Sequence, residues 1–214
     1  MAVFVFDMDG VIIDSEMLYL EREKEFFRYK GMDYDDNVML KTVGRNGKDC
    51  FKLYKEEIKG FNYNSLEELR KEKREYFKDR IIDYRNLVDK NIYNVLKELK
   101  KRGHSISLAS SSSKNNINQV LGELQITDYF DHIISGEDFV HSKPDPEIYL
   151  YVKKQYNDDN FYAIEDSTIG IMAAKKANMK VIGKKDNRFG FDQSSADYLI
   201  DDLNEIIDIA DEKI

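Results

Sequence analysis

Hydrophobic and polar positions follow two different patterns along this chain. Near the N-terminus, four consecutive apolar residues, Val3 to Phe6, run directly into Asp7-Met8-Asp9-Gly10. A short continuous run of β-forming residues is typical of a strand that is buried on both faces of a parallel sheet. From Asp89 onward, similar short runs alternate with segments whose apolar residues lie at helical spacing. Strands that alternate with helices predict right-handed crossovers and a parallel sheet.

This alternation predicts an α/β fold with a doubly wound parallel sheet, a Rossmann-like core. The expected strands cover residues 3–6, 104–109, 131–134, 161–164, 181–182 and 198–200. The expected helices cover residues 92–99, 117–124, 146–156, 169–178 and 203–210. Gly103 follows the first of these helices as a stop signal, and Pro146 suits the first position of the third.

Between the first strand and the regular alternation, the pattern is helical throughout. Helices are expected at residues 15–30, 37–40, 48–58 and 65–81, and no segment there has the character of a strand. Gly31 is the expected stop of the first helix, and Ser65 with Glu68 forms a capping box at the start of the last. We therefore expect a core of residues 1–14 and 85–214 with an inserted helical domain of residues 15–84.

Composition and charge limit the binding partners and the cellular compartments that we expect for this protein. The chain has 214 residues, of which 42% are hydrophobic and 35% charged, and charges of both signs are interleaved. Its formal net charge of −8 excludes a nucleic-acid backbone as an expected partner. Cys50 is the only cysteine, which suits a reducing compartment. The first apolar run ends at Asp7, and we therefore expect neither a signal peptide nor a membrane span. We expect a cytoplasmic location.

Reactive residue types follow three of the predicted strands. Asp7 and Asp9 follow the first strand, Ser110 the second, and Glu165 with Asp166 the fourth. A doubly wound sheet brings these strand ends to one rim. Lys143 lies in the loop after the third strand and can reach the same rim.

Such a cluster of carboxylates predicts a metal and an anionic substrate. Carboxylates that lie close together repel one another, and a hard divalent cation such as Mg²⁺ removes the repulsion. Together with Lys143, the cation would create a positive pocket in an acidic protein, which is suited to phosphate. Ser110 and the backbone N–H groups of the following helix can bind phosphate oxygens.

Four segments in order carry a resemblance to a known family. Asp7-x-Asp9-Gly10-Val11, Ser110 after a strand, Lys143-Pro144 and Glu165-Asp166-Ser167 resemble the four motifs of the haloacid dehalogenase-like superfamily. The helical insertion directly after the first motif is similar to the cap of the β-phosphoglucomutase-like subgroup. The resemblance covers nearly the whole chain. The insertion joins the core by two short crossings, near residues 13–15 and 82–86, and we expect hinge motion there to close the site and exclude water.

The resemblance implies a role for each motif residue. Asp7 would be the nucleophile that forms an aspartyl-phosphate, and Asp9 the general acid and base. Asp7, the backbone carbonyl of Asp9 and Asp166 would hold Mg²⁺, with Glu165 as a direct or water-mediated ligand. Ser110 and Ser111 would bind the transferred phosphoryl group, and Lys143 would offset its charge. Family members that dehalogenate or cleave phosphonates lack the second aspartate, so Asp9 favours phosphate-ester chemistry.

Three functions remain open from the sequence. The resemblance favours a phosphatase for a small phosphorylated metabolite, such as a sugar phosphate, and we expect it to act as a monomer. The alternative is a β-phosphoglucomutase-type mutase, but mutases carry a histidine five residues after the aspartate that corresponds to Asp14, where this chain has Tyr19. The mutase's cap arginine matches Arg45 only imperfectly, and Asp14-Ser15-Glu16 is more similar to the phosphatases. A third hypothesis is a binding protein without turnover.

The remaining candidates have structural interpretations. His104, His132 and His141 are scattered without the spacing of metal ligands. Cys50 has no predicted base beside it, and we expect a buried or neutral thiol.

Overall fold

The chain folds into two compact units. A computed structural model describes residues 1–45, 47–158 and 160–211. The first unit, called the core unit below, consists of Met1–Asp14 and Tyr84–Ile214, and the second, the helical unit, of Ser15–Asp83. No helix within the described residues is both long enough and apolar enough to cross a membrane.

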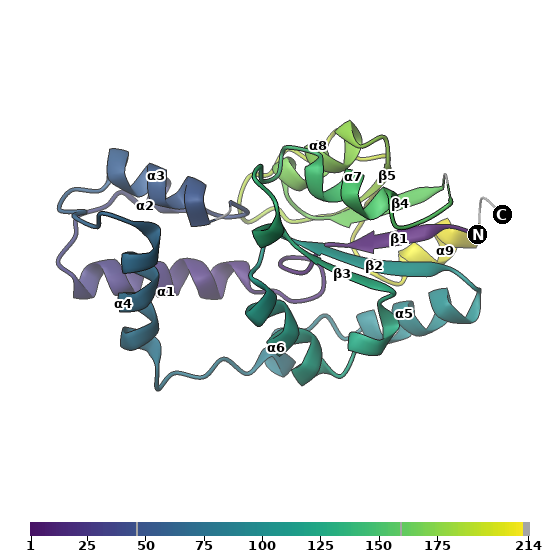
Figure 1. Ribbon diagram of the computed structural model, residues 1–214, viewed down its shortest axis with the longest axis horizontal. Helices are drawn as coiled ribbons and strands as arrows, with labels where there is room; N and C mark the ends of the chain where they lie inside the picture. Colours follow the sequence, from purple (N-terminus) through teal and green to yellow (C-terminus); the bar gives the residue numbers. More distant parts are fainter. Residues whose placement is uncertain (46, 159, 212–214) are drawn as a thin grey trace. The chain divides into compact units, whose positions relative to one another are not determined.

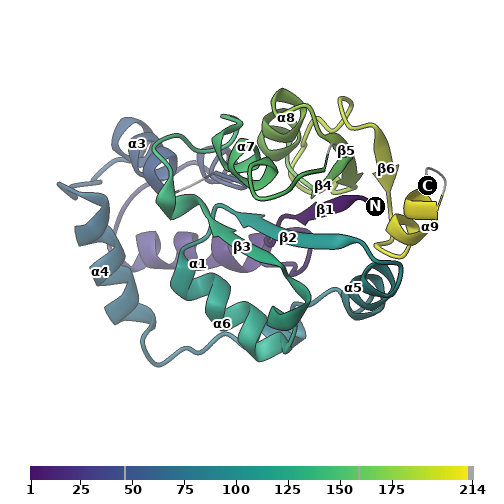
Figure 2. The same cartoon turned by 45° about the vertical axis from the view of Figure 1, so that its right-hand side comes forward.

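The core unit is built on a parallel sheet, as the alternating pattern predicted (Figure 1). In the described residues the sheet has six strands in the order β3-β2-β1-β4-β5-β6, and every neighbouring pair is parallel. The strands are β1 Val3–Phe6, β2 Ser105–Ser110, β3 His132–Ser135, β4 Phe161–Glu165, β5 Lys180–Lys184 and β6 Tyr198–Ile200. All six are labelled in Figure 2.

The strand order reverses its direction next to β1. The chain builds β2 and β3 on one side of β1 and then crosses to place β4 on the other side. In doubly wound folds, ligands bind in the crevice outside the carboxyl ends of the strands at this reversal. The predicted site residues Asp7 and Glu165 lie at the ends of β1 and β4, so the topology brings them together.

Helices cover both faces of the sheet. They are α5 Ile92–Lys101, α6 Lys114–Leu124, α7 Glu147–Lys153, α8 Thr168–Lys176 and α9 Glu205–Asp211, with 3₁₀ turns η1 Tyr84–Asn86, η2 Thr127–Tyr129 and η3 Gly136–Asp138. In Figures 1 and 2, α7 and α8 lie on one side of the sheet and α5 and α6 on the other. The doubly wound fold class is confirmed.

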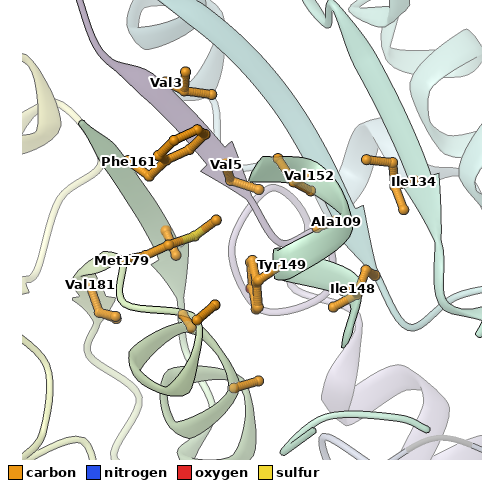
Figure 3. Packing of buried hydrophobic residues seen from close by; sticks show 14 of the residues in the cluster. Val3, Val5, Ala109, Ile134, Ile148, Tyr149, Val152, Phe161, Met179 and Val181 are labelled. Carbon is orange, nitrogen blue, oxygen red and sulfur yellow. The ribbon is translucent and has the colours of Figure 1, made fainter. Parts of the chain in front are cut away.

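The face under α7 and α8 determines where the site side chains point. Val3 and Val5 pack there with residues of β4, α7 and α8, as Figure 3 shows. Successive residues of a strand point to opposite faces. Asp7 lies two residues after Val5 and points to the same face of the sheet as Val3 and Val5. Glu165 lies two residues after Ala163 and points to the same face as Phe161 and Ala163. Both carboxylates are therefore directed to the side of the sheet that carries α7.

The helical unit has its own core of aromatic rings. Its helices are α1 Glu16–Tyr29, α2 Asp36–Leu40, α3 Gly47–Glu57 and α4 Leu66–Phe77. Phe27 on α1 contacts Tyr54 and Phe61 edge-to-face, at centroid distances of 4.9 and 6.1 Å. Ring contacts of this kind add to the free energy of apolar burial. The aromatic residues of this segment thus form a core.

Two helices end earlier than the apolar pattern predicted. Helix α4 ends at Phe77 rather than near Ile81, and the Arg80 carbonyl accepts a hydrogen bond of 2.7 Å from the Arg22 side chain on α1. Helix α7 ends at Lys153, which lets Tyr156 turn away and share a 2.6 Å hydrogen bond with Ser107 on β2. In both cases a residue just beyond the helix end is hydrogen-bonded to a residue distant in the sequence.

The two chain segments that leave and re-enter the core unit are hydrogen-bonded to each other. Ile13 and Val88 form an antiparallel bridge. The Asp14 N–H donates to the Leu87 carbonyl at 2.8 Å, and the Asp89 N–H donates to the Ile12 carbonyl at 2.9 Å. Both ends of the insertion are thus held side by side within the core unit.

Candidate active site

Three of the predicted site residues form a buried charged cluster. The Lys143 Nζ donates to Asp7 Oδ1 at 2.9 Å and to Glu165 Oε1 at 2.7 Å. The exposed fractions of the three residues are 6%, 8% and 0% for Lys143, Asp7 and Glu165. Charge-assisted hydrogen bonds in such a buried place are strong, and they hold the Asp7 carboxylate in one orientation.

Lys143 is held in place by further contacts. Its Nζ also donates to the Ala109 carbonyl at 3.1 Å, and it lies 5.1 Å from the centroid of the Tyr149 ring. Burial alone lowers the pKa of Lys143, but the carboxylates of Asp7 and Glu165 outweigh it, and the pKa lies well above its ordinary value. Lys143 therefore remains a cation throughout the physiological pH range.

The two carboxylate oxygens of Glu165 differ in their hydrogen bonding. Its Oε1 accepts from Lys143 and from the Tyr149 hydroxyl, whereas its Oε2 has no hydrogen-bond partner among the described residues. Burial raises the pKa of Glu165 to about 7, and the Lys143 ammonium acts in the opposite direction. A buried carboxylate oxygen without a donor is costly, so a site of this kind calls for a cation or a polar ligand.

Gly170 on α8 makes room for this carboxylate. A Cβ at this position would lie 2.0 Å from Glu165 Oε2 and 2.2 Å from its Cδ. We expect Gly170→Ala to lower the free energy of unfolding by about 2 kcal/mol, because an overpacked group must displace Glu165. Urea denaturation measures the change.

Gly122 on α6 is the matched control for that substitution. A Cβ there meets nothing within 4 Å, so only helix propensity changes. We expect Gly122→Ala to raise the free energy of unfolding by up to about 1 kcal/mol. If the two substitutions had the same effect, the close packing at Gly170 would not limit stability.

Three carboxylates are close enough to hold one cation. Ligand oxygens of Asp7, Glu165 and Asp166 all lie within 4.8 Å of one another, and all three residues are buried. Gly10, at a φ of 79°, permits the close approach, because a Cβ there would lie 2.0 Å from Asp166 Oδ2. The oxygen donors suit a hard divalent cation such as Mg²⁺. The donor set and the open Glu165 oxygen both fit such an ion.

The loop that carries Asp166 is anchored by a residue that sequence reasoning missed. The Gln193 side chain is 8% exposed and donates from Nε2 to the carbonyls of Asp166 and Lys184. Its Oε1 accepts from the Asp186 N–H at 3.3 Å. This amide connects the loops after β4 and β5. No local pattern marks it in the sequence, because a glutamine in a polar loop is ordinarily solvated.

Asp9 contacts the serine run that follows β2. Ser112 Oγ donates to Asp9 Oδ2 at 2.8 Å. Ser110 is fully buried, and its Oγ accepts from the Ser112 N–H at 3.1 Å. For Ser111, the described contacts include no side-chain hydrogen bond to the other candidates. The structure therefore brings Asp7, Lys143, Glu165 and Asp166 into one cluster and connects Asp9 to Ser110 through Ser112.

The surroundings of two histidines and of the cysteine are also defined in the structure. His104 is buried and its Nδ1 accepts from the Ala2 N–H at 3.2 Å, while His132 packs edge-to-face on Tyr156. Both have structural contacts, as predicted. Burial raises the pKa of Cys50 to about 12, so its thiol is neutral at physiological pH.

Comparison with known proteins identifies relatives over most of the chain. The family model described as haloacid dehalogenase-like hydrolase matches residues 4–184. The chain is 28% identical over 186 residues to phosphorylated carbohydrates phosphatase of Thermotoga maritima, covering 85% of this chain and 84% of that protein. It is 29% identical over 206 residues to validoxylamine A 7'-phosphate phosphatase of Streptomyces hygroscopicus subsp. limoneus, covering 95% of each.

A solved structure with the same fold is β-phosphoglucomutase from Clostridium difficile. The TM-score is 0.81 at 28% identity, and the match covers 100% of this chain and 97% of that chain. The likeness extends over both units of the present chain.

Proposed function

The chain belongs to the haloacid dehalogenase-like hydrolase family, in its β-phosphoglucomutase-like subgroup, and on this premise we propose that it is a Mg²⁺-dependent phosphatase of small phosphorylated carbohydrates. It is a phosphoric monoester hydrolase that acts through an aspartyl-phosphate on Asp7. The observation that carries the proposal is the Asp7 carboxylate, which is oriented by the Lys143 ammonium and lies within reach of two further carboxylates. The relative named for phosphorylated carbohydrates supports the substrate class, and the relative named for validoxylamine A 7'-phosphate also acts on a phosphorylated small molecule.

In the proposed reaction, each residue of the site has its own role. Asp7 attacks the phosphorus atom of the ester, and its carboxylate oxygen forms the new P–O bond as the alkoxide leaves. Asp9 gives a proton to the leaving alkoxide and afterwards takes a proton from the water that hydrolyses the aspartyl-phosphate. Lys143 remains charged and stabilises the negative charge on Asp7 and on the phosphoryl oxygens. Ser110, the last residue of β2, and Ser111, which follows it, contribute to the phosphoryl-binding site.

A magnesium ion would be held by Asp7, Asp166 and the backbone carbonyl of Asp9, with Glu165 as a direct or water-mediated ligand. When bound, it supplies positive charge to phosphate oxygens in the site. The protein's own part is to keep the carboxylates in place, and Gly10, Gly170 and Gln193 do so through the contacts described above.

A mutase is the second candidate, and a specific observation favours it. The likeness to β-phosphoglucomutase covers the whole chain. In a mutase, a sugar hydroxyl rather than water accepts the phosphoryl group. Tyr19 stands where the mutase motif has a histidine, which supports hydrolysis instead. Incubation with β-glucose 1-phosphate and a bisphosphate activator, followed by detection of glucose 6-phosphate, separates the two.

Phosphate release from p-nitrophenyl phosphate and from a panel of sugar phosphates tests the proposal. We expect turnover with Mg²⁺, and a loss of at least about 100-fold when EDTA removes the metal, with recovery on re-addition of Mg²⁺. Circular dichroism in EDTA serves as the control that the fold is retained. A chain that binds these esters without releasing phosphate would be a binding protein, and activity that is unchanged in EDTA would contradict the metal requirement.

A further inference from the structure

We propose that Ser112 is a positioning residue that orients the carboxylate of Asp9 for proton transfer. The inference rests on the proposed function, in which Asp9 protonates the leaving alkoxide, and it adds a residue that the motif pattern did not identify. Its basis is the 2.8 Å hydrogen bond from Ser112 Oγ to Asp9 Oδ2. The two residues are 103 positions apart in the chain, so the contact is made by the fold.

This hydrogen bond is the last of a chain of hydrogen bonds that begins at Tyr84. The Tyr84 hydroxyl donates to Asn116 Oδ1 at 2.8 Å, and Asn116 Nδ2 donates to Ser112 Oγ at 3.3 Å. A serine hydroxyl has one proton and two lone pairs. One lone pair of the Ser112 hydroxyl accepts from the Asn116 amide, and its proton is donated to Asp9. The chain thus runs in one direction, from Tyr84 to the Asp9 carboxylate.

Each member of this chain is fixed independently of the others. The Ser112 N–H donates to Ser110 Oγ at 3.1 Å, and the Ser112 carbonyl accepts from Ser135 Oγ at 2.7 Å. The Asn116 N–H donates to the Ser113 side chain, which caps α6. Tyr84 is only 3% exposed and begins the core unit after the helical insertion. The hydroxyl that faces Asp9 therefore starts from a well-defined position.

This arrangement has a consequence for catalysis. A donor on Oδ2 fixes the rotation of the Asp9 carboxylate, so the proton moves from an oxygen whose position is set before the substrate binds. Proton transfer from a positioned acid contributes about 10²–10⁴-fold, and a displacement of about 1 Å can remove much of that. Asp7 is held by Lys143 and does not depend on Ser112.

A comparison of two leaving groups tests the role. An alkyl phosphate leaves as an alkoxide and needs a proton, whereas 2,4-dinitrophenyl phosphate leaves as a stable phenolate and does not. We expect Ser112→Ala to lower kcat/KM about 10-fold for a sugar phosphate that the wild type hydrolyses, and less than about 2-fold for the dinitrophenyl ester. Asp9→Ala is the reference and should show the same selectivity with a larger loss.

Conservative variants provide the controls. Ser112→Thr retains the hydroxyl and should recover most of the activity on the alkyl ester. Tyr84→Phe removes the hydroxyl that donates to Asn116 and should show a smaller loss with the same selectivity; it also tests the idea if Ser112→Ala does not fold. Ser194→Ala, in an exposed loop, should change neither substrate.

Either of two results would overturn the inference: equal losses on both esters, or no loss on the alkyl ester. In both cases a wild type that still hydrolyses both esters keeps the proposed function intact. The wild type is measured first. If it hydrolyses neither ester, the proposed function is wrong, and this result is known before any variant is compared.

Discussion

Replacing Asp7 by Asn should lower kcat for phosphate-ester hydrolysis by about six orders of magnitude, the scale on which loss of a nucleophile acts in enzymes with covalent intermediates. An amide oxygen does not form the P–O bond that the proposed mechanism needs. The substitution keeps the shape of the side chain and an acceptor for Lys143, whose Nζ lies 2.9 Å from Asp7 Oδ1. The fold should therefore survive.

Two measurements check this expectation. Phosphate release gives the loss of turnover, and acid quenching with a labelled ester locates a covalent label on the peptide that contains Asp7 in the wild type only. Asp197→Asn is the matched control, because Asp197 pairs with Lys175 and accepts from the Val181 N–H away from the site. Turnover by Asp7→Asn above about a hundredth of the wild-type rate would refute the nucleophilic role.

Replacing Lys143 by Met should destabilise the protein by about 3–5 kcal/mol, because it leaves the carboxylates of Asp7 and Glu165 buried without a counter-ion. Methionine has a similar length and fills the same space. Thermal or urea unfolding in EDTA measures the loss. Lys100→Met is the matched control: its ion pair with Asp131, at 2.6 Å, is partly exposed, and such pairs contribute less than about 1 kcal/mol.

The loss in Lys143→Met should also depend on pH. Burial already raises the pKa of Glu165 to about 7, and without the ammonium it should rise further. A carboxyl group whose pKa is higher in the folded than in the unfolded state favours folding below its unfolded pKa and loses this contribution as pH rises through the folded value. The variant should thus be less destabilised at pH 5.5 than at pH 8. Equal losses at both pH values would contradict the buried-charge explanation.

Much of the fold could be predicted because its pattern is local. The β1 run from Val3 to Phe6 and the helical spacing in α5 and α6 reflect burial, and burial leaves a periodic mark in the sequence. Strand ends could then be assigned to one rim from topology alone. Helix ends were less predictable: α4 ends at Phe77, and the Arg22 side chain donates to the Arg80 carbonyl in the segment that follows. That contact joins distant residues and has no local signature.

In the candidate site, too, some features follow from the local sequence pattern and others depend on contacts between distant residues. Asp7 faces Lys143 as strand alternation allows, but Asp9 lies in the turn after β1, where a period of two no longer applies, and it contacts Ser112. The role of each serine in the run from Ser110 to Ser113 depends on the turn that they form. Tyr149 packs in the apolar cluster as its helical position suggests, and only the folded chain reveals that its hydroxyl donates to Glu165.

The bridge between Ile13 and Val88 bears on how such a protein can change over evolutionary time. The ends of the insertion meet at Asp14 and Leu87, whose backbone groups are 2.8 Å apart, so segments of very different length can be joined there at little extra entropic cost. An ancestral gene could therefore exchange one inserted segment for another while the sheet and the residues at its rim are inherited unchanged.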